Sequence, residues 1–418
     1  MAGGEPVTDA LASAPRSAFI RYWTAATISS FGSAVTGVAM PVLVVQLLGA
    51  TPFEVGVVNA AQFVPYAVFG FVAGAYTDRW RRKPTLVWSS VGRALSLGAV
   101  PVLWLIGHLQ IWLLAIALLA FGAFSVFGFA ATQSLLPRLV PRTQLVAANA
   151  RLDQSDSAAQ TLGPAIGGGL VGMCGAPVAI VIDAVSYLVD AALNASIRVR
   201  EPRAGSRTRD LRQEINDGLR WTYRHRTLGP LAVSTHIWFF ANGAAVTVLS
   251  LLALRTLGLT AYVFGTLLAV FGITSLIGAS LAPAFGARFG SGRVIISARV
   301  AYPMAWLLIT LAPATGRGEV LLFIALGLLG LAAGIENPNE MGYWQALTPD
   351  ELLGRINATR RSVNQSMAAL GALIAGLGVG LIGERHTLVM ATIGFATAAL
   401  AVALSPLRQS PDQRAEER

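Results

Sequence analysis

Ionisable side chains inside long apolar stretches are the residues of this sequence best suited to do chemistry. Asp190 and Glu336 each stand about two helical turns in from one end of such a stretch, with no arginine beside them in the sequence. A charge at membrane depth is costly unless it is paired or hydrated. A carboxylate there can bind a proton while buried and release it when hydrated or paired. We therefore predict that Asp190 and Glu336 couple proton movement to the function of the protein.

Five further residues are candidates for the same role. Asp183, Tyr187 and Asp190 follow one another at helical spacing, so they share one face of a helix. A structural alternative stays open for each carboxylate, because it could instead form a buried ion pair, as Asp156 could with Arg93. His236 could equally be a packed or hydrogen-bonded core residue. The further candidates are Asp183, Asp156, Glu340, His236 and Arg93.

Aromatic and amide side chains in the same stretches could line a binding cavity. Such groups offer a broad, adaptable surface to amphipathic molecules. The same side chains can instead pack between helices, and the sequence leaves both roles open. The candidates are Gln62, Tyr66, Trp238, Phe239, Asn242, Asn364 and Gln365.

The elements that must position these residues are long apolar segments. Of the 418 residues, 54% are hydrophobic and 12% are charged, whereas ordinary soluble domains have roughly 25% charged residues. This composition excludes a soluble globular protein and a disordered chain. A membrane-spanning helix needs about 20 apolar residues, so the sequence predicts an all-α membrane protein with twelve spans. They lie near 18–47, 53–76, 84–106, 110–134, 150–173, 176–197, 228–254, 261–287, 292–313, 318–344, 356–382 and 386–407.

The basic residues set the orientation of these spans. With the N-terminus inside, one face carries 26 of the 31 Lys and Arg residues and the other face carries Arg255, Arg317 and Arg385. Basic residues in short loops favour the cytoplasmic side. We therefore expect an inner (plasma) membrane protein with both termini in the cytoplasm. The net charge of +10 then reflects orientation and contact with lipid headgroups, not nucleic-acid binding.

A shift of 208 or 209 residues aligns the two sets of six stretches. Residues 141–150 and 349–358 both read P-x3-L-x3-N-A, so two six-helix bundles follow one another with the same orientation. Parallel repeats of this kind bind their ligand between the bundles near the middle of the membrane. The predicted domains are an N-terminal bundle at 1–197, a cytoplasmic linker at 198–226, and a C-terminal bundle with a cytoplasmic tail at 227–418.

The linker contains the one long polar stretch between predicted spans. Leu211, Ile215, Leu219 and Tyr223 recur at four-residue spacing, which predicts an amphipathic helix over 208–224 lying on the inner leaflet. A disordered basic linker is the alternative.

With this layout the chain resembles the major facilitator superfamily. Its sequence from 74 to 83 is similar to the signature loop G-x-L-x-D-R-x-G-R-R/K of that superfamily, although Tyr76 replaces the leucine and Arg81 the second glycine. The resemblance implies a conformational latch between helices, because a carboxylate can dock on the positive end of a neighbouring helix. A plain positive-inside stop signal is the alternative. The latch residues would be Gly74, Asp78, Arg79, Arg82 and Lys83.

A second motif resembles the G-P-x-x-G-G sequence of drug/proton antiporters. Its residues are Gly163, Pro164, Gly167 and Gly168 in the fifth span, with Ala159 where another glycine is usual. Small residues allow close helix approach and proline removes a backbone donor, so the motif predicts a bend and a tight seal, or ordinary small-residue packing. The stretch 133–150 is similar to the branch that includes macrolide efflux proteins and the enterobactin exporter.

The resemblance implies a secondary transporter that exports a small amphipathic drug or metabolite in exchange for protons, by alternating access of the two bundles. Proton-driven nutrient uptake and a non-transporting membrane receptor or scaffold are the alternatives. The sequence contains no nucleotide loop, H-E-x-x-H or G-x-S-x-G motif, which argues against an enzyme. Cys174 is the single cysteine, and we predict neither cofactor nor metal. The expected partners of a monomer are a small molecule, protons and membrane lipid.

Overall fold

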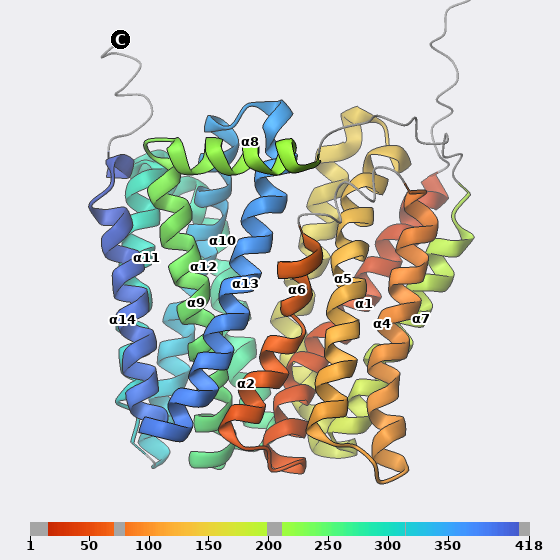
Figure 1. Cartoon of the computed structure of the whole chain (residues 1–418), viewed down its shortest axis with the longest axis vertical. Helices are drawn as coiled ribbons and strands as arrows, with labels where there is room; N and C mark the ends of the chain where they lie inside the picture. The colour runs from red at the N-terminus through yellow and green to blue at the C-terminus, as the bar shows by residue number, and fades with distance from the viewer. Residues whose placement is uncertain (1–15, 71–79, 199–210, 314, 409–418) are drawn as a thin grey trace, which may run out of the picture.

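Helices account for all the regular secondary structure that the computed structural model describes, which covers residues 16–70, 80–198, 211–313 and 315–408 (Figure 1). The first half comprises α1 (Arg16–Val42), α2 (Pro52–Ala61), a helical stretch at 64–70, α4 (Arg82–Leu105), α5 (Ile111–Leu139), α6 (Leu145–Cys174) and α7 (Ala176–Ser196). The second half comprises α9 (Leu228–Leu251), α10 (Ala261–Phe289), α11 (Ser291–Thr310), α12 (Gly316–Leu347), α13 (Asp350–Ile382) and α14 (Glu384–Ala403).

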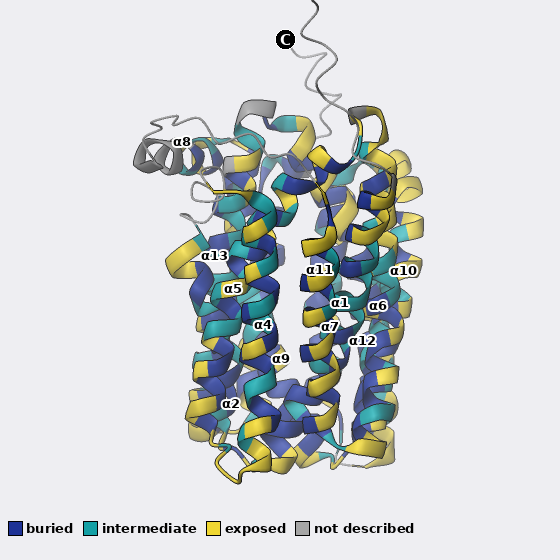
Figure 2. Ribbon diagram, turned by 90° about the vertical axis from the view of Figure 1, so that its right-hand side faces the viewer, coloured by how far each residue is buried: buried dark blue, intermediate teal, exposed yellow. Residues whose placement is uncertain are grey.

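The fold is an all-α membrane bundle of two six-helix halves. Ten of the described helices are long and apolar enough to cross a membrane, and α6 and the chain from α2 to residue 70 complete the twelve. Large apolar side chains are exposed on the outside of the bundle, among them Trp88, Leu105 and Leu381, and exposed positions run along its outer helices (Figure 2). Such a surface would aggregate in water but is suited to contact lipid.

One further helix, α8 (Leu211–Arg224), connects the halves and lies across one end of the bundle (Figure 1). It packs on α9 and α13 of the second half. We call this the α8 end and the opposite one the far end. The predicted amphipathic segment 208–224 matches α8 from residue 211 onward, and residues 208–210 lie outside the described ranges.

Several helices extend beyond the predicted apolar stretches at the α8 end. Helix α5 continues to Leu139, where the sequence predicted an end near 134, and α6 begins at Leu145 in place of 150. Helix α13 begins at Asp350 in place of 356. Hydropathy marks only the part of a helix that lies in hydrocarbon, so the polar start of α13 was not counted. The added turns of α5 and α6 are largely apolar but lie beside Pro137, Arg138, Pro141 and Arg142, which interrupt the apolar stretch.

The two most extensive contacts between the halves are those of α6 with α10 and of α2 with α13. Both pairs meet at glycine. A Cβ added to Gly168 would lie 2.7 Å from the Ala261 carbonyl oxygen, and one added to Gly56 would lie 2.6 Å from that of Ala372. No side chain fits at such distances, so these backbones touch directly.

Short π-helical turns follow α1 and α9 at matching positions. They span Leu43–Leu47 and Leu252–Thr256, which begin 209 residues apart. The next helices start after threonine N-caps, Thr51 for α2 and Thr260 for α10, also 209 apart. In each case the threonine side chain accepts a backbone hydrogen bond of the first turn and so stabilises the helix start. The two halves therefore repeat one backbone plan at the offset that the sequence predicted.

At the far end, two reciprocal hydrogen bonds join the π-helical turn of each half to the loop that follows the π-helical turn of the other half. Gln46 Nε2 donates to the Leu259 carbonyl at 3.0 Å, and Arg255 Nη2 donates to the Ala50 carbonyl. Gln46 and Arg255 are equivalent positions of the repeat, and so are Ala50 and Leu259. We call this pair of contacts the far-end clasp.

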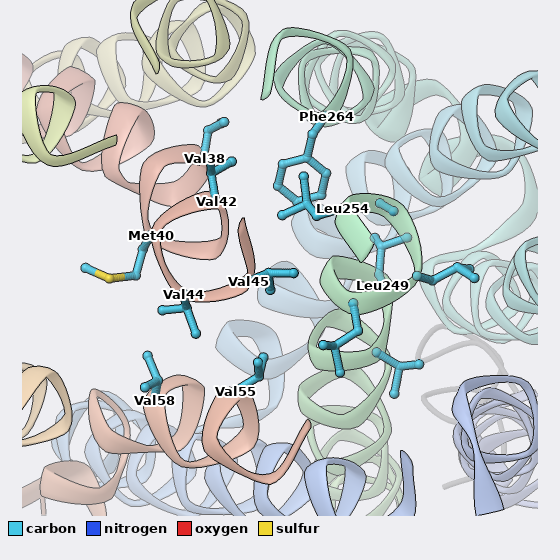
Figure 3. Packing of buried hydrophobic residues seen from close by; sticks show 14 of the residues in the cluster. Val38, Met40, Val42, Val44, Val45, Val55, Val58, Leu249, Leu254 and Phe264 are labelled. Atoms are coloured by element: carbon cyan, nitrogen blue, oxygen red, sulfur yellow. The ribbon is translucent and has the colours of Figure 1, made fainter. Parts of the chain in front are cut away.

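Buried apolar side chains surround the clasp. Val42 and Val45 of the first half belong to the same buried cluster as Leu254 and Phe264 of the second (Figure 3). Burial of this apolar surface favours contact between the halves at the far end.

Candidate functional site

A half-buried arginine and a buried carboxylate form the centre of a polar cluster in the first half. Arg93 Nη2 of α4 lies 3.9 Å from Asp190 Oδ2 of α7 and donates to Ser90 Oγ at 3.0 Å. Ser90 Oγ donates to Asp190 in turn, and Asn194 Nδ2 donates to Asp190 Oδ1 at 3.0 Å. Asp190 is buried, so these partners replace water around its charge.

Two more residues of α7 extend this cluster toward α1. Arg93 Cζ lies 4.4 Å from the centroid of the Tyr187 ring, and the Tyr187 hydroxyl lies 2.7 Å from Ser33 Oγ. Asp183, one turn before Tyr187, is 1% exposed and accepts a hydrogen bond from Ser186 Oγ at 3.2 Å. The first-half cluster thus contains two buried carboxylates, Asp183 and Asp190, and one arginine.

The pairing suggested for Arg93 from the sequence is wrong. Its ion-pair partner is Asp190, whereas Asp156 of α6 accepts a hydrogen bond from Ser30 Oγ of α1 at 3.1 Å. Asp190 has no arginine near it in the sequence, but Arg93 reaches it from another helix.

The second half contains a corresponding cluster around Arg299 of α11. Arg299 Nη2 lies 2.8 Å from Glu340 Oε2, and its Nε donates to Glu336 Oε1. The same Nη2 donates to Thr235 Oγ1 of α9 at 3.0 Å. Glu336, like Asp190, therefore has an arginine neighbour that the sequence did not reveal.

A second arginine completes this cluster. Arg360 Nη2 of α13 lies 2.9 Å from Glu340 Oε1, and its Cζ lies 3.8 Å from the centroid of the Trp344 ring. Trp344 Nε1 donates to the same carboxylate at 3.3 Å. The second-half cluster thus contains two arginines and two glutamates, so its formal charges balance.

His236 links three helices near this cluster. Its Nδ1 lies 2.7 Å from Asn364 Oδ1 of α13, and its Nε2 lies 2.7 Å from the Tyr223 hydroxyl of α8. Burial raises the pKa of the Tyr223 phenol above its usual value, so at neutral pH this hydroxyl keeps its proton and can donate to His236. His236 is therefore a hydrogen-bonded residue that ties α8 to the second half.

The structure separates the aromatic and amide residues that the sequence grouped as cavity candidates. Trp238 packs in a ring cluster with Phe239, Tyr302 and Phe395. The side chain of Asn364 is hydrogen-bonded to His236. Tyr66 is buried near the boundary between the halves. The remaining candidates, which are half-buried, are Gln62, Asn242 and Gln365.

Arg361 is a residue that the sequence reasoning missed at this boundary. Its Cζ lies 3.7 Å from the centroid of the Phe129 ring of α5 and 5.4 Å from that of Tyr66, so an arginine of the second half rests on two aromatic rings of the first. The count of basic residues by side places both Arg361 and Arg360 among the 26 of the inner face. Both arginines stand inside the predicted eleventh span, 356–382, and that position was the available signal.

The latch motif is described only in part. Gly74, Asp78 and Arg79 lie outside the described residues. Arg82 and Lys83 form the first two positions of α4 and are half-buried. Basic residues at a helix start are unfavourable for the helix dipole, so helix stability does not account for them.

The glycine–proline motif lies where α6 passes between two helices. A Cβ at Gly167 would meet the Val35 backbone of α1 at 3.0 Å, whereas Gly168 faces the Ala261 carbonyl of α10. Gly163 faces Ala34 of α1, and the Pro164 carbonyl faces α10. The motif therefore lets α6 touch a helix of its own half and one of the other half at once.

Curated relatives support the same fold and a transport role. The chain is 33% identical over 279 residues to an uncharacterised MFS-type transporter, y4rN, of Sinorhizobium fredii, covering 66% of this chain and 67% of that one. It is 27% identical to the multidrug efflux pump Tap of Mycolicibacterium fortuitum, covering 84% and 87%. It is 21% identical to macrolide efflux protein A of Streptococcus pyogenes, covering 88% and 91%.

Solved structures that superpose on the chain show the same fold. The nucleoside transporter NupG superposes with a TM-score of 0.73 at 11% identity, covering 92% of this chain and 98% of that one. A bacterial homologue of the lysosomal transporter Spinster, in an inward-facing and occupied conformation, gives 0.70 at 13%, covering 94% and 98%. The sequence profile of the Major Facilitator Superfamily matches residues 22–372. The chain therefore belongs to the Major Facilitator Superfamily and is a multi-pass membrane transporter.

Proposed function

We propose that this transporter exports a small amphipathic molecule in exchange for protons, by alternating access of its two halves. The efflux names of two relatives that align over most of the chain support export. The α8 end is assigned to the cytoplasm because 26 of the 31 basic residues belong to that side of the predicted topology. The substrate site then lies between the halves, opening in turn to each side.

The unequal charges of the two buried clusters carry the proposal of proton coupling. The second-half cluster is balanced, with two arginines and two glutamates. The first-half cluster has one arginine for Asp183 and Asp190. If both carboxylates were ionised, one negative charge would remain uncompensated at membrane depth, which is costly. One proton bound to this pair removes the excess, so Asp190 with Asp183 is the proposed proton site.

Arg93 can link the protonation of Asp190 to the conformation of the transporter. When Asp190 is ionised it holds Arg93, whereas a protonated Asp190 leaves the arginine to Asp183 and to the Tyr187 ring. The same residues join α4, α7 and α1, so proton binding and release would change the packing of three helices. Glu336, Glu340 and Arg299 are assigned a structural role in this proposal, and Asp156 has no part in it.

The remaining parts of the chain support this cycle. We propose the domain division 1–197, 198–226 and 227–418, with α8 resting on the second half and meeting lipid headgroups on its outer side. The resemblance of residues 74–83 to the superfamily signature supports a latch at the α8 end, for which Asp78→Asn should lower the turnover rate. Normal turnover of that variant would reject the latch.

A growth and accumulation assay tests the export proposal. Drug-sensitive bacteria that express the chain should accumulate less of at least one macrolide or dye from a broad panel, and a protonophore should abolish the difference. Greater accumulation would indicate proton-driven uptake instead. Unchanged accumulation across the panel, with the protein present in the membrane, would favour a receptor or scaffold and reject export.

A further inference from the structure

Two consecutive arginines of α13, Arg360 and Arg361, lie in different environments. Arg360 points into the second-half cluster, where it pairs with Glu340 and covers the Trp344 ring. Arg361 is turned by about 100° around the helix axis and faces the first half, where its guanidinium lies over Phe129 and near Tyr66.

Arg361 lacks a counter-ion among the residues that the structure describes. The neighbouring membrane-depth arginines Arg93, Arg299 and Arg360 each have a carboxylate within 4 Å. Arg361 has none there, and its Nε has no hydrogen-bond partner in the described part of the chain. Aromatic rings compensate a half-buried cation only in part, so this guanidinium is prepared to accept an anion.

The surroundings of Arg361 add the other features of a site for an aromatic anion. Phe129 is 38% exposed, so part of its surface remains accessible beside the guanidinium. Gln133 and Gln365 follow Phe129 and Arg361 by four residues, which places each on the same helix face as its partner. Neither amide is fully buried. Together they offer hydrogen-bond donors next to a charge and an aromatic face.

We propose that Arg361 binds the anionic group of the transported molecule, and that the substrate class is an aromatic organic anion such as a carboxylate. A guanidinium binds a carboxylate through two parallel hydrogen bonds, while the ring system of the substrate packs beside Phe129. Arg361 belongs to the second half and Phe129 to the first. A movement between the halves would therefore change the contact of the substrate with Arg361 and its contact with Phe129 together. This inference rests on the proposed export function.

A matched pair of dyes tests the charge preference. Fluorescein and rhodamine 123 share a xanthene ring system, but the first is anionic and the second cationic. The full-length protein is reconstituted in phosphatidylcholine nanodiscs, and the binding of each dye is followed by fluorescence anisotropy. We expect fluorescein to bind more tightly than rhodamine 123. Arg361→Gln should weaken fluorescein binding by roughly 10-fold or more and leave rhodamine 123 unchanged, with Arg361→Lys in between.

Two controls make the result specific. Arg151→Gln removes one exposed positive charge from α6 at the α8 end and should leave both affinities unchanged. Adding phosphatidylglycerol to the nanodiscs tests whether a lipid headgroup is the anion that Arg361 holds. If it is, phosphatidylglycerol should displace fluorescein from the parent protein and should have no effect on fluorescein binding by the Arg361→Gln variant. Fluorescein binding in pure phosphatidylcholine should still depend on Arg361.

Several outcomes would overturn the inference while leaving export intact. A protein that exports other compounds but binds rhodamine 123 in preference to fluorescein rejects it. So does wild-type fluorescein affinity in a folded Arg361→Gln variant, as judged by its thermal unfolding. If the wild-type protein lowers the accumulation of no compound in the drug-accumulation assay, the proposed function itself is rejected.

Discussion

At the scale of single residues, removing a negative charge should have different consequences in the two buried clusters. Asp190 belongs to a cluster in which the negative charges are in excess, so an uncharged residue there resembles its protonated form. Glu336 belongs to a balanced cluster, and removing its charge leaves Arg299 with Glu340, which Arg360 also shares. A buried charge that loses its partner destabilises the fold strongly.

We therefore expect Asp190→Asn to remain folded and to lose proton-driven export by at least about 10-fold, which corresponds to about 1.4 kcal/mol. Glu336→Gln should instead lower the free energy of unfolding by about 3–5 kcal/mol. Thermal unfolding in detergent and gradient-driven export in vesicles separate the two effects. Asp153→Asn, which changes an exposed carboxylate of α6, is the control. A stable, uncoupled Glu336→Gln protein would contradict the charge-balance argument.

The sequence singled out Asp183, Asp190, Glu336 and Glu340, which are buried, but not their partners, and its further candidate Asp156 is exposed. Asp190, Glu336 and Glu340 could be selected because a charge within an apolar stretch is rare. Their arginines come from other helices, and helix rotation and contact cannot be read from one sequence. Arg361 was missed for a related reason, because counting basic residues by side of the membrane hides how far each lies within its helix.

At the scale of helices, the contact between the halves depends on single glycines. Gly168 touches the backbone of α10, whereas its neighbour Gly169 has open space around it. Both lie in the same turn of α6, so an alanine at either position changes helix propensity in the same favourable direction. They differ in whether an added methyl group has room.

Gly168→Ala should therefore force α6 away from α10 and reduce the free energy of unfolding by about 1–3 kcal/mol relative to Gly169→Ala. Export should fall in the first variant and remain in the second. Thermal unfolding and dye accumulation measured side by side check this expectation. Equal stability of the two variants would mean that the α6–α10 contact is looser than the described backbone positions imply.

The helices themselves were more predictable than their ends. Ten described helices meet the criteria for a span because hydropathy reports the part of a helix in lipid. The residues that extend α13 are mostly polar, and those that extend α5 and α6 lie beside Pro137, Arg138, Pro141 and Arg142, which interrupt the apolar stretch, so these turns were not predicted. The motif from Gly163 to Gly168 predicted close packing, but its use by two different neighbours, α1 and α10, required the structure.

At the scale of the whole molecule, orientation in the membrane is open to a direct test through the single cysteine. Cys174 is exposed at the last position of α6, at the far end. With the α8 end in the cytoplasm, a membrane-impermeant maleimide added to intact cells should label the unmodified protein. Arg151→Cys in a Cys174→Ser background should be labelled only after the cells are opened. The reverse pattern would place the termini outside.

The far-end clasp also has a meaning for the origin of the molecule. Equivalent positions, Gln46 and Arg255, each bind a carbonyl at the other's equivalent site, Leu259 and Ala50, which is the pattern of an isologous interface between identical subunits. If the chain arose by duplication and fusion of a dimer, the two equivalent positions could now hold different side chains that still make equivalent hydrogen bonds across the interface. Exchanging them, with Gln46→Arg and Arg255→Gln together, should preserve thermal stability better than either single change, whereas additive losses would argue against this ancestry.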